Sequence, residues 1–111
     1  MSQVVSNNAP GGSPLVLTYT PPSGQTARLI AAQASVKVSV LAVSGELTIT
    51  GLTGDILREK IEVSAGAGDR IQLNIPSNGI VASGIDVPIV MTVPNLGVGL
   101  AGWMICDSLT G

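Results

Sequence analysis

Turn-forming residues interrupt this chain at short, regular intervals, and no other feature limits its fold as strongly. The 111 residues include 14 glycines and 7 prolines. Many of them stand in short clusters, such as Pro21–Gly24 and Pro76–Gly79. The clusters recur about every ten residues, a spacing typical of all-β sandwiches and barrels. The spacing of these turn-forming clusters therefore predicts an all-β domain.

Between the turns, apolar and polar residues alternate with the two-residue period of a half-buried strand. We expect the clearest strand over 35–43, with Val36, Val38 and Val40 on one face. The turn at Ser44 and the alternating segment 46–50 predict that these two strands form a hairpin.

Segment 55–64 is compatible with either a helix or a strand. Leu57 and Ile61 stand four residues apart, as on a helix face, and Asp55 is a suitable helix cap. The same residues also alternate together with Val63, so we predict a strand. Altogether the sequence predicts an antiparallel, jelly-roll-like β-sandwich of roughly eight or nine short strands. The strands are expected over 15–20, 28–33, 35–43, 46–50, 55–64, 70–75, 80–83, 86–93 and 98–107.

The length suits one domain, which we expect to cover 15–111. Segment 1–14 is rich in Ser, Asn, Gly and Pro and predicts a flexible N-terminal arm. Such an arm either stays disordered or becomes ordered on a neighbouring subunit. In the second case its contacts would come from Val4, Val5, Asn7 and Asn8.

Apolar residues are more abundant than one small core requires. Hydrophobic residues make up 45% of the chain and charged residues 11%, against a usual charged share of about 25%. Because small domains have thin cores and monomers rarely expose large apolar patches, the excess predicts a homo-oligomer. Strands 86–93 and 98–107 are apolar on both faces, so we place the interface there. The predicted interface residues are Val87, Ile89, Met91, Val93, Leu96, Val98, Leu100, Trp103 and Met104, with Trp103 as a core or interface anchor.

The residue types needed for catalysis are scarce. The chain has no histidine, so neither its single cysteine, Cys106, nor any serine has the usual general base. We expect Cys106 to be a buried, inert thiol. Segment 97–102 matches the GxGxxG dinucleotide pattern, but the chain ends too soon for the helix and second strand that this pattern serves. We therefore expect no enzyme and no cofactor. Metal-ligand clusters are also lacking, although a calcium site across loops stays open.

Charge and hydropathy also limit the partners. The net charge is −2 and no basic block occurs, so we expect no nucleic-acid binding. Segment 87–106 is uncharged and long enough to cross a bilayer. Its prolines, its glycines and Asn95 favour a turn between two strands instead, so we expect no membrane partner.

Residues 25–110 resemble a diffuse group of small phage virion β-sandwich proteins of the head-decoration, minor capsid or capsid-fibre type. The resemblance rests on ARLIAAQ (Ala27–Gln33), SAGAGDRIQLNIP (Ser64–Pro76) and GIVASGI (Gly79–Ile85), followed by an apolar final strand. It implies a virion location, a structural role, a homotrimer, and contact with the major capsid protein or another virion protein. The apolar end at Trp103–Cys106 departs from the pattern.

A second function stays open, namely a β-module that recognises a carbohydrate or a host receptor. Such modules stack sugars on exposed aromatic rings, and this chain offers only Tyr19 and Trp103. The two functions differ in where they place Trp103. Assembly favours a buried anchor, whereas ligand recognition requires the indole at the surface.

Overall fold

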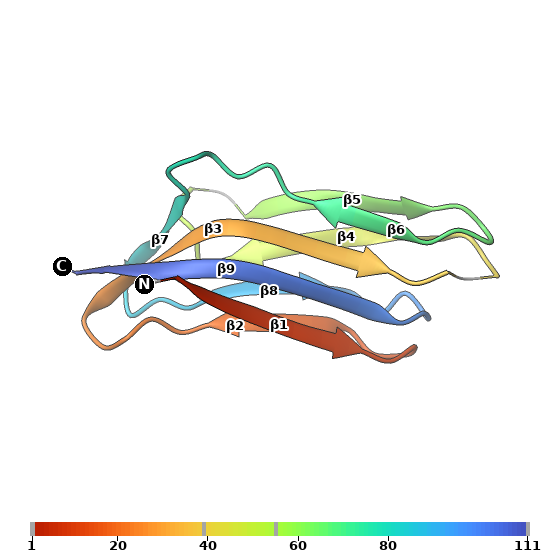
Figure 1. Ribbon diagram of the computed structural model, residues 1–111, viewed down its shortest axis with the longest axis horizontal. Helices are drawn as coiled ribbons and strands as arrows, with labels where there is room; N and C mark the ends of the chain where they lie inside the picture. The colour runs from red at the N-terminus through yellow and green to blue at the C-terminus, as the bar shows by residue number, and fades with distance from the viewer. Residues whose placement is uncertain (1, 39, 55, 111) are drawn as a thin grey trace.

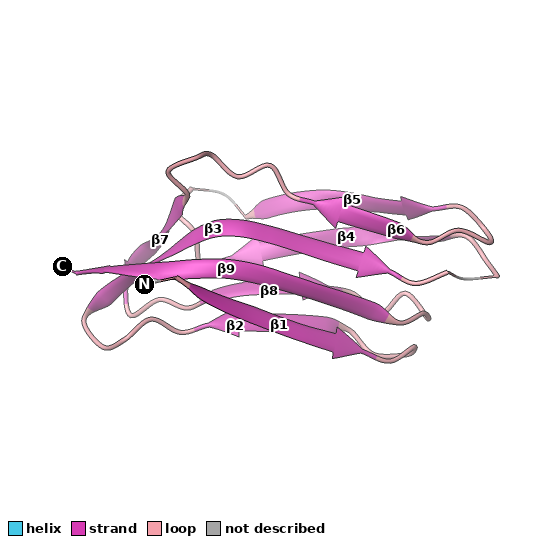
Figure 2. Ribbon diagram, in the orientation of Figure 1, coloured by secondary structure: helices cyan, strands magenta, loops and turns pink. Residues whose placement is uncertain are grey.

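The structure is a computed structural model that describes residues 2–38, 40–54 and 56–110. These residues form strands and no helix (Figures 1 and 2). They therefore contain no helix that is long and apolar enough to cross a membrane. The predicted all-β fold is confirmed. In the described residues the strands are β1 (Gln3–Ala9), β2 (Leu15–Tyr19), β3 (Gln25–Val36), β4 (Val43–Thr50), β5 (Leu57–Val63), β6 (Asp69–Gln72), β7 (Ile80–Ile85), β8 (Ile89–Val93) and β9 (Leu100–Thr110).

The strands form two antiparallel sheets packed face to face. Sheet A has the order β1-β9-β3-β6, with β7 also paired to β3, and sheet B has the order β2-β8-β4-β5. The pairing is nested: β1 pairs with β9, β2 with β8, β3 with β6 and β7, and β4 with β5. One long hairpin rolled into two layers has this arrangement, which is that of a jelly roll. The predicted jelly-roll-like sandwich is therefore confirmed.

The core lies between the two sheets and follows the two-residue period. In β2, Leu15, Leu17 and Tyr19 are buried while the residues between them are exposed. Leu47 and Ile49 of β4 are fully buried, as their alternation predicts. Burial of each such aliphatic side chain contributes about 1.5–3 kcal/mol. Since the chain contains no Phe, Leu, Ile, Val, Met and Ala make up most of this core, together with Tyr19 and Cys106.

Segment 57–63 forms the edge strand β5 rather than a helix, which confirms the choice made from its alternation. Ile61 and Val63 are buried, and Leu57 is half-buried against the core. Asp55, the alternative helix cap, lies outside the described residues.

The predicted strand over 35–43 is wrong. β3 ends at Val36, where the amide of Lys37 donates a hydrogen bond to Gly99 O at 3.0 Å, and the chain then crosses to sheet B. Val38 is 71% exposed and Val40 is 88% exposed. The predicted hairpin is wrong for the same reason, because β4 pairs with β5 and β8 instead. Alternation is a local signal and cannot show where the two facing sheets end. These valines lie beyond that point and therefore have no facing layer.

The predicted flexible arm is also wrong for most of its length. β1 pairs with β9 from Gln3↔Cys106 to Ala9↔Leu100, so the folded domain begins well before residue 15. An uncovered β9 would present a row of unpaired backbone groups at the sheet edge. The polar composition of the segment did not predict this strand pairing, because the hydrogen bonds between strands are made by the backbone and need no apolar side chains.

Several predicted interface residues belong to the core instead. Ile89, Met91, Val93, Leu100 and Met104 are at most 1% exposed. Both β8 and β9 are interior strands of their sheets, so the opposite sheet of the same chain covers their inner faces. These five side chains are closed to any partner. The remaining four, Val87, Leu96, Val98 and Trp103, are half-buried.

Candidate functional site

Trp103 lies on the outer face of sheet A. Its neighbours in β9, Met104 and Cys106, point into the core and are fully buried, so the strand period turns Trp103 outward. On either side it is paired with Ser6 of β1 and Gln33 of β3. In the adjacent row, Ala101 is paired with Asn8 and Ser35.

A shallow hollow of about 470 Å³ opens beside Trp103. It forms where the small side chain of Ala101 stands between larger polar neighbours. Its volume falls within the range of about 300–1,000 Å³ that small-molecule sites occupy. The hollow is lined by Ser6, Asn7, Asn8, Gln33, Ala34, Ser35, Ala101, Gly102 and Trp103, none of which carries a charge.

The sequence predicts Trp103 as a core or interface anchor; the structure excludes the core position, and a role at an interface stays a prediction. Its side chain is half-buried and lines the hollow rather than the space between the sheets. Sequence reasoning did not select Ser6, Gln33, Ser35 or Ala101. They come from three strands far apart in the chain, and only their register brings them together. Asn8, which the sequence predicts as a contact of the N-terminal arm, lines the hollow.

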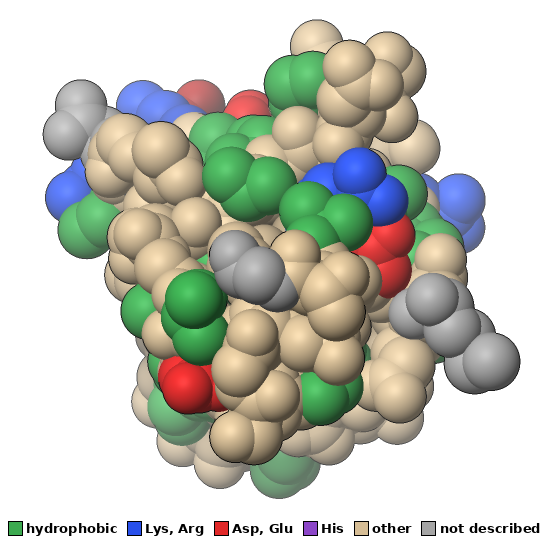
Figure 3. Space-filling model, turned by 90° about the vertical axis from the view of Figure 1, so that its left-hand side faces the viewer, with side chains coloured by type: hydrophobic (Ala, Val, Ile, Leu, Met, Phe, Trp, Pro, Cys, Tyr) green, Lys and Arg blue, Asp and Glu red, His purple; other side chains and the backbone are tan. Residues whose placement is uncertain are grey.

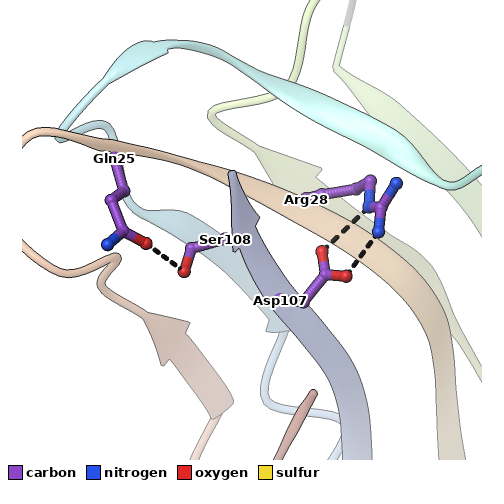
Figure 4. Close-up of polar contacts among 4 residues, drawn as sticks. All are labelled: Gln25, Arg28, Asp107 and Ser108. Carbon is purple, nitrogen blue, oxygen red and sulfur yellow. Dashed lines mark hydrogen bonds and ion pairs between the residues drawn. The ribbon is translucent and has the colours of Figure 1, made fainter. Parts of the chain in front are cut away.

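A bidentate ion pair lies on the outer face of sheet A, near the chain termini (Figure 4). Arg28 Nε donates to Asp107 Oδ1 at 2.8 Å, and Arg28 Nη2 donates to Asp107 Oδ2 at 2.5 Å. Beside it, the hydroxyl of Ser108 donates to Gln25 Oε1 at 2.5 Å. Each contact joins β3 to β9, so the two tie together the central strands of sheet A.

We expect this ion pair to make part of the protein's stability dependent on pH. The hydrogen bonds from Arg28 lower the pKa of the Asp107 carboxyl in the folded state. The unfolded chain therefore binds the proton more readily, and the contribution is present above the unfolded pKa of about 3.9 and lost as pH falls below it. The melting temperature should fall between pH 7 and pH 3, and this fall should be smaller in Asp107→Asn. An equal fall in both proteins would contradict the assignment.

Cys106 is the buried thiol that the sequence predicts. Desolvation, and secondarily the negative charge of Asp107, raise its pKa to about 12. Since the thiolate is the reactive form, the group is inert at neutral pH.

A second feature lies at one end of the long axis, where the described residues of the loops 10–14, 37–42, 64–68 and 94–99 gather (right-hand end of Figure 1). We call this end the four-loop tip. The amide of Lys37 bonds to Gly99 O, Gly68 lies against the backbone of Val38, and Gly11 lies against that of Gly97. Lys37 is the only charged residue in these four segments.

Three large aliphatic side chains project from the four-loop tip. Val38 is 71%, Val40 88% and Leu41 73% exposed. Leu96 and Val98, two of the predicted interface residues, lie half-buried in the adjoining loop and pack against the core. The opposite end of the molecule carries both acidic and basic side chains among apolar ones (Figure 3). Among the described residues, the three most exposed large hydrophobic side chains lie at the tip.

The outer face of sheet B carries two exposed ion pairs at its β4–β5 edge. Arg58 Nη1 lies 2.6 Å from Glu46 Oε1, and Lys60 Nζ lies 2.7 Å from Glu62 Oε1. These exposed ion pairs keep the β4–β5 edge polar and disfavour the pairing of a further strand with it. Within 2–38, 40–54 and 56–110, no group of three or more His, Cys, Asp or Glu side chains is placed to hold a metal ion.

No known protein family matches the sequence, and no curated protein is found to be related to it.

Proposed function

We propose that the protein is a non-catalytic structural subunit of a virion that assembles through its four-loop tip. The exposure of Val38, Val40 and Leu41 at one end of the molecule carries this proposal. Exposed apolar clusters of this kind mark interaction surfaces in soluble proteins. Burial of each side chain in an interface would contribute about 1.5–3 kcal/mol before the costs of association.

The shape of the molecule supports contact through an end. The body measures 48 × 22 × 20 Å, and the tip lies at one end of the longest dimension. Copies that meet there, in the homotrimer that the resemblance implies, bury their apolar loops around a shared axis and leave both sheet faces uncovered. The major capsid protein or another virion protein is the further partner. Viral capsid domains often have the jelly-roll form, a supporting analogy at the level of fold.

Light scattering on Val40→Asp tests the proposal. We expect the wild-type protein to be oligomeric at micromolar concentration and Val40→Asp to associate about 100-fold more weakly or worse, because the interface would then bury an unpaired carboxylate. Ile85→Asp is the matched control: Ile85 is 51% exposed at the end of β7, which lies at the opposite end of the molecule (Figure 1). A monomeric wild-type protein, or equal loss of association in both variants, would refute the proposal.

A further inference from the structure

The residues that line the hollow around Trp103 carry no charge, and the charged residue next to them is Arg70 of β6, which is paired with Ser35 and lies outside the lining. β1 contains no charged residue, and β9 contains only Asp107, which Arg28 neutralises several residues away from the hollow. In β3, the residues opposite Ala101 and Trp103 are Ser35 and Gln33. A ligand in this hollow therefore meets hydroxyls, amides and one aromatic ring, and no formal charge.

The polar groups of the hollow are available for a ligand. In the described part of the chain, the side chains of Ser6, Asn8, Gln33 and Ser35 make no hydrogen bond to another group of the protein. The side chain of Asn7, by contrast, is engaged: its amide nitrogen donates to Val16 O at 3.4 Å and its oxygen accepts from the amide of Asn8 at 2.9 Å. Four side chains that donate and accept thus line the hollow together with the indole.

We propose that this hollow binds a neutral glycan. A sugar ring has an apolar C–H surface that packs on an aromatic ring, and hydroxyl groups that hydrogen-bond to amides and hydroxyls. Trp103 supplies the first kind of contact, and Gln33, Asn8, Ser6 and Ser35 supply the second. A charged ligand would gain no ion pair from the lining residues. A shallow, open site of this kind predicts weak binding, of about millimolar Kd per site.

The site goes beyond the proposed assembly and is compatible with it. The hollow lies on the outer face of sheet A and adjoins the four-loop tip, because Asn8, Ser35 and Ala101 stand two residues from the loops 10–14, 37–42 and 94–99. Its opening is on the long side of the molecule, whereas the apolar loops project from the end. An oligomer joined through its tips presents one hollow per subunit. Several weak sites then act together on a surface that carries many copies of the glycan.

Trp103 fluorescence gives a direct test, because this is the only tryptophan of the chain. We expect a saturable change in its emission on titration with at least one neutral oligosaccharide, from a panel built of glucose, galactose, mannose and N-acetylglucosamine. Ala101→Leu fills the hollow and Gln33→Ala removes an amide. Both variants keep the reporter and should bind at least about tenfold more weakly, a loss of about 1.4 kcal/mol.

Gln72→Ala is the matched control, since Gln72 continues the row of Gln33 on β6 but lies outside the hollow. It should bind like the wild-type protein. The proposal is overturned if no oligosaccharide of the panel changes the emission, or if Gln72→Ala loses as much affinity as Gln33→Ala. Light scattering on Ala101→Leu separates this proposal from the assembly proposal, because filling the hollow should leave association through the tip unchanged.

Discussion

Replacing Gly51 with alanine is expected to destabilise the protein by about 3 kcal/mol or more. Gly51 follows β4 with a φ of +89°, a conformation that costs a residue with a Cβ atom about 1–2 kcal/mol. A Cβ at this position would also stand 2.1 Å from Pro88 O, a backbone atom that cannot rotate away. Relief of this contact requires the loops after β4 and before β8 to separate.

The turn at Gly51 also joins β7 to the rest of the fold, which makes the loss larger. The amide of Ser83 donates to Gly51 O at 2.8 Å, and the amide of Thr53 donates to Val81 O at 2.9 Å. A displaced turn would weaken both hydrogen bonds.

Gly54→Ala is the control for the backbone conformation alone. Gly54 has the same φ of +89°, but a Cβ atom added there would have nothing within 4 Å. The substitution should cost only about 1–2 kcal/mol in urea unfolding. Equal losses in the two variants would show that the close approach of Pro88 is not present in solution.

The second large effect is expected for Met104→Ala, at about 2–5 kcal/mol. Met104 is fully buried between the sheets, and its truncation leaves a cavity that the rigid sheets cannot close. Urea unfolding measures this loss, with an unchanged slope if only stability changes.

Trp103→Ala is the matched comparison, because it changes the adjacent residue on the opposite face of the same strand. Trp103 is larger than Met104, so a sequence argument alone predicts that its loss costs more. Since Trp103 is half-buried on the outer face, we expect a clearly smaller loss of unfolding free energy. A larger loss than that of Met104→Ala would place Trp103 in the core.

Local patterns were sufficient for the fold class and for much of the core. Leu47, Ile49, Ile61 and Ile71 are buried where the alternation puts them inward, because a strand exposes alternate side chains to opposite faces whatever it pairs with. The glycine and proline clusters likewise marked most of the places where strands end. These signals are contained in a few consecutive residues.

The interface prediction was wrong for Ile89, Met91, Val93, Leu100 and Met104, because apolar content does not say what covers a strand. β8 and β9 each lie inside a sheet and face the other sheet, so the chain itself covers their inner faces. The most exposed large apolar residues are instead Val38, Val40 and Leu41 in the loop where alternation suggested a strand.

Periodicity and turn chemistry act over a few residues, so they were enough to predict short antiparallel strands with one apolar face. Three features became visible only in the folded molecule: the first strand covers the edge of the last, Val38 and Val40 have no layer to pack on, and Ser6, Gln33 and Trp103 lie side by side. Each of these depends on pairing between segments far apart in the chain, which composition and periodicity do not encode.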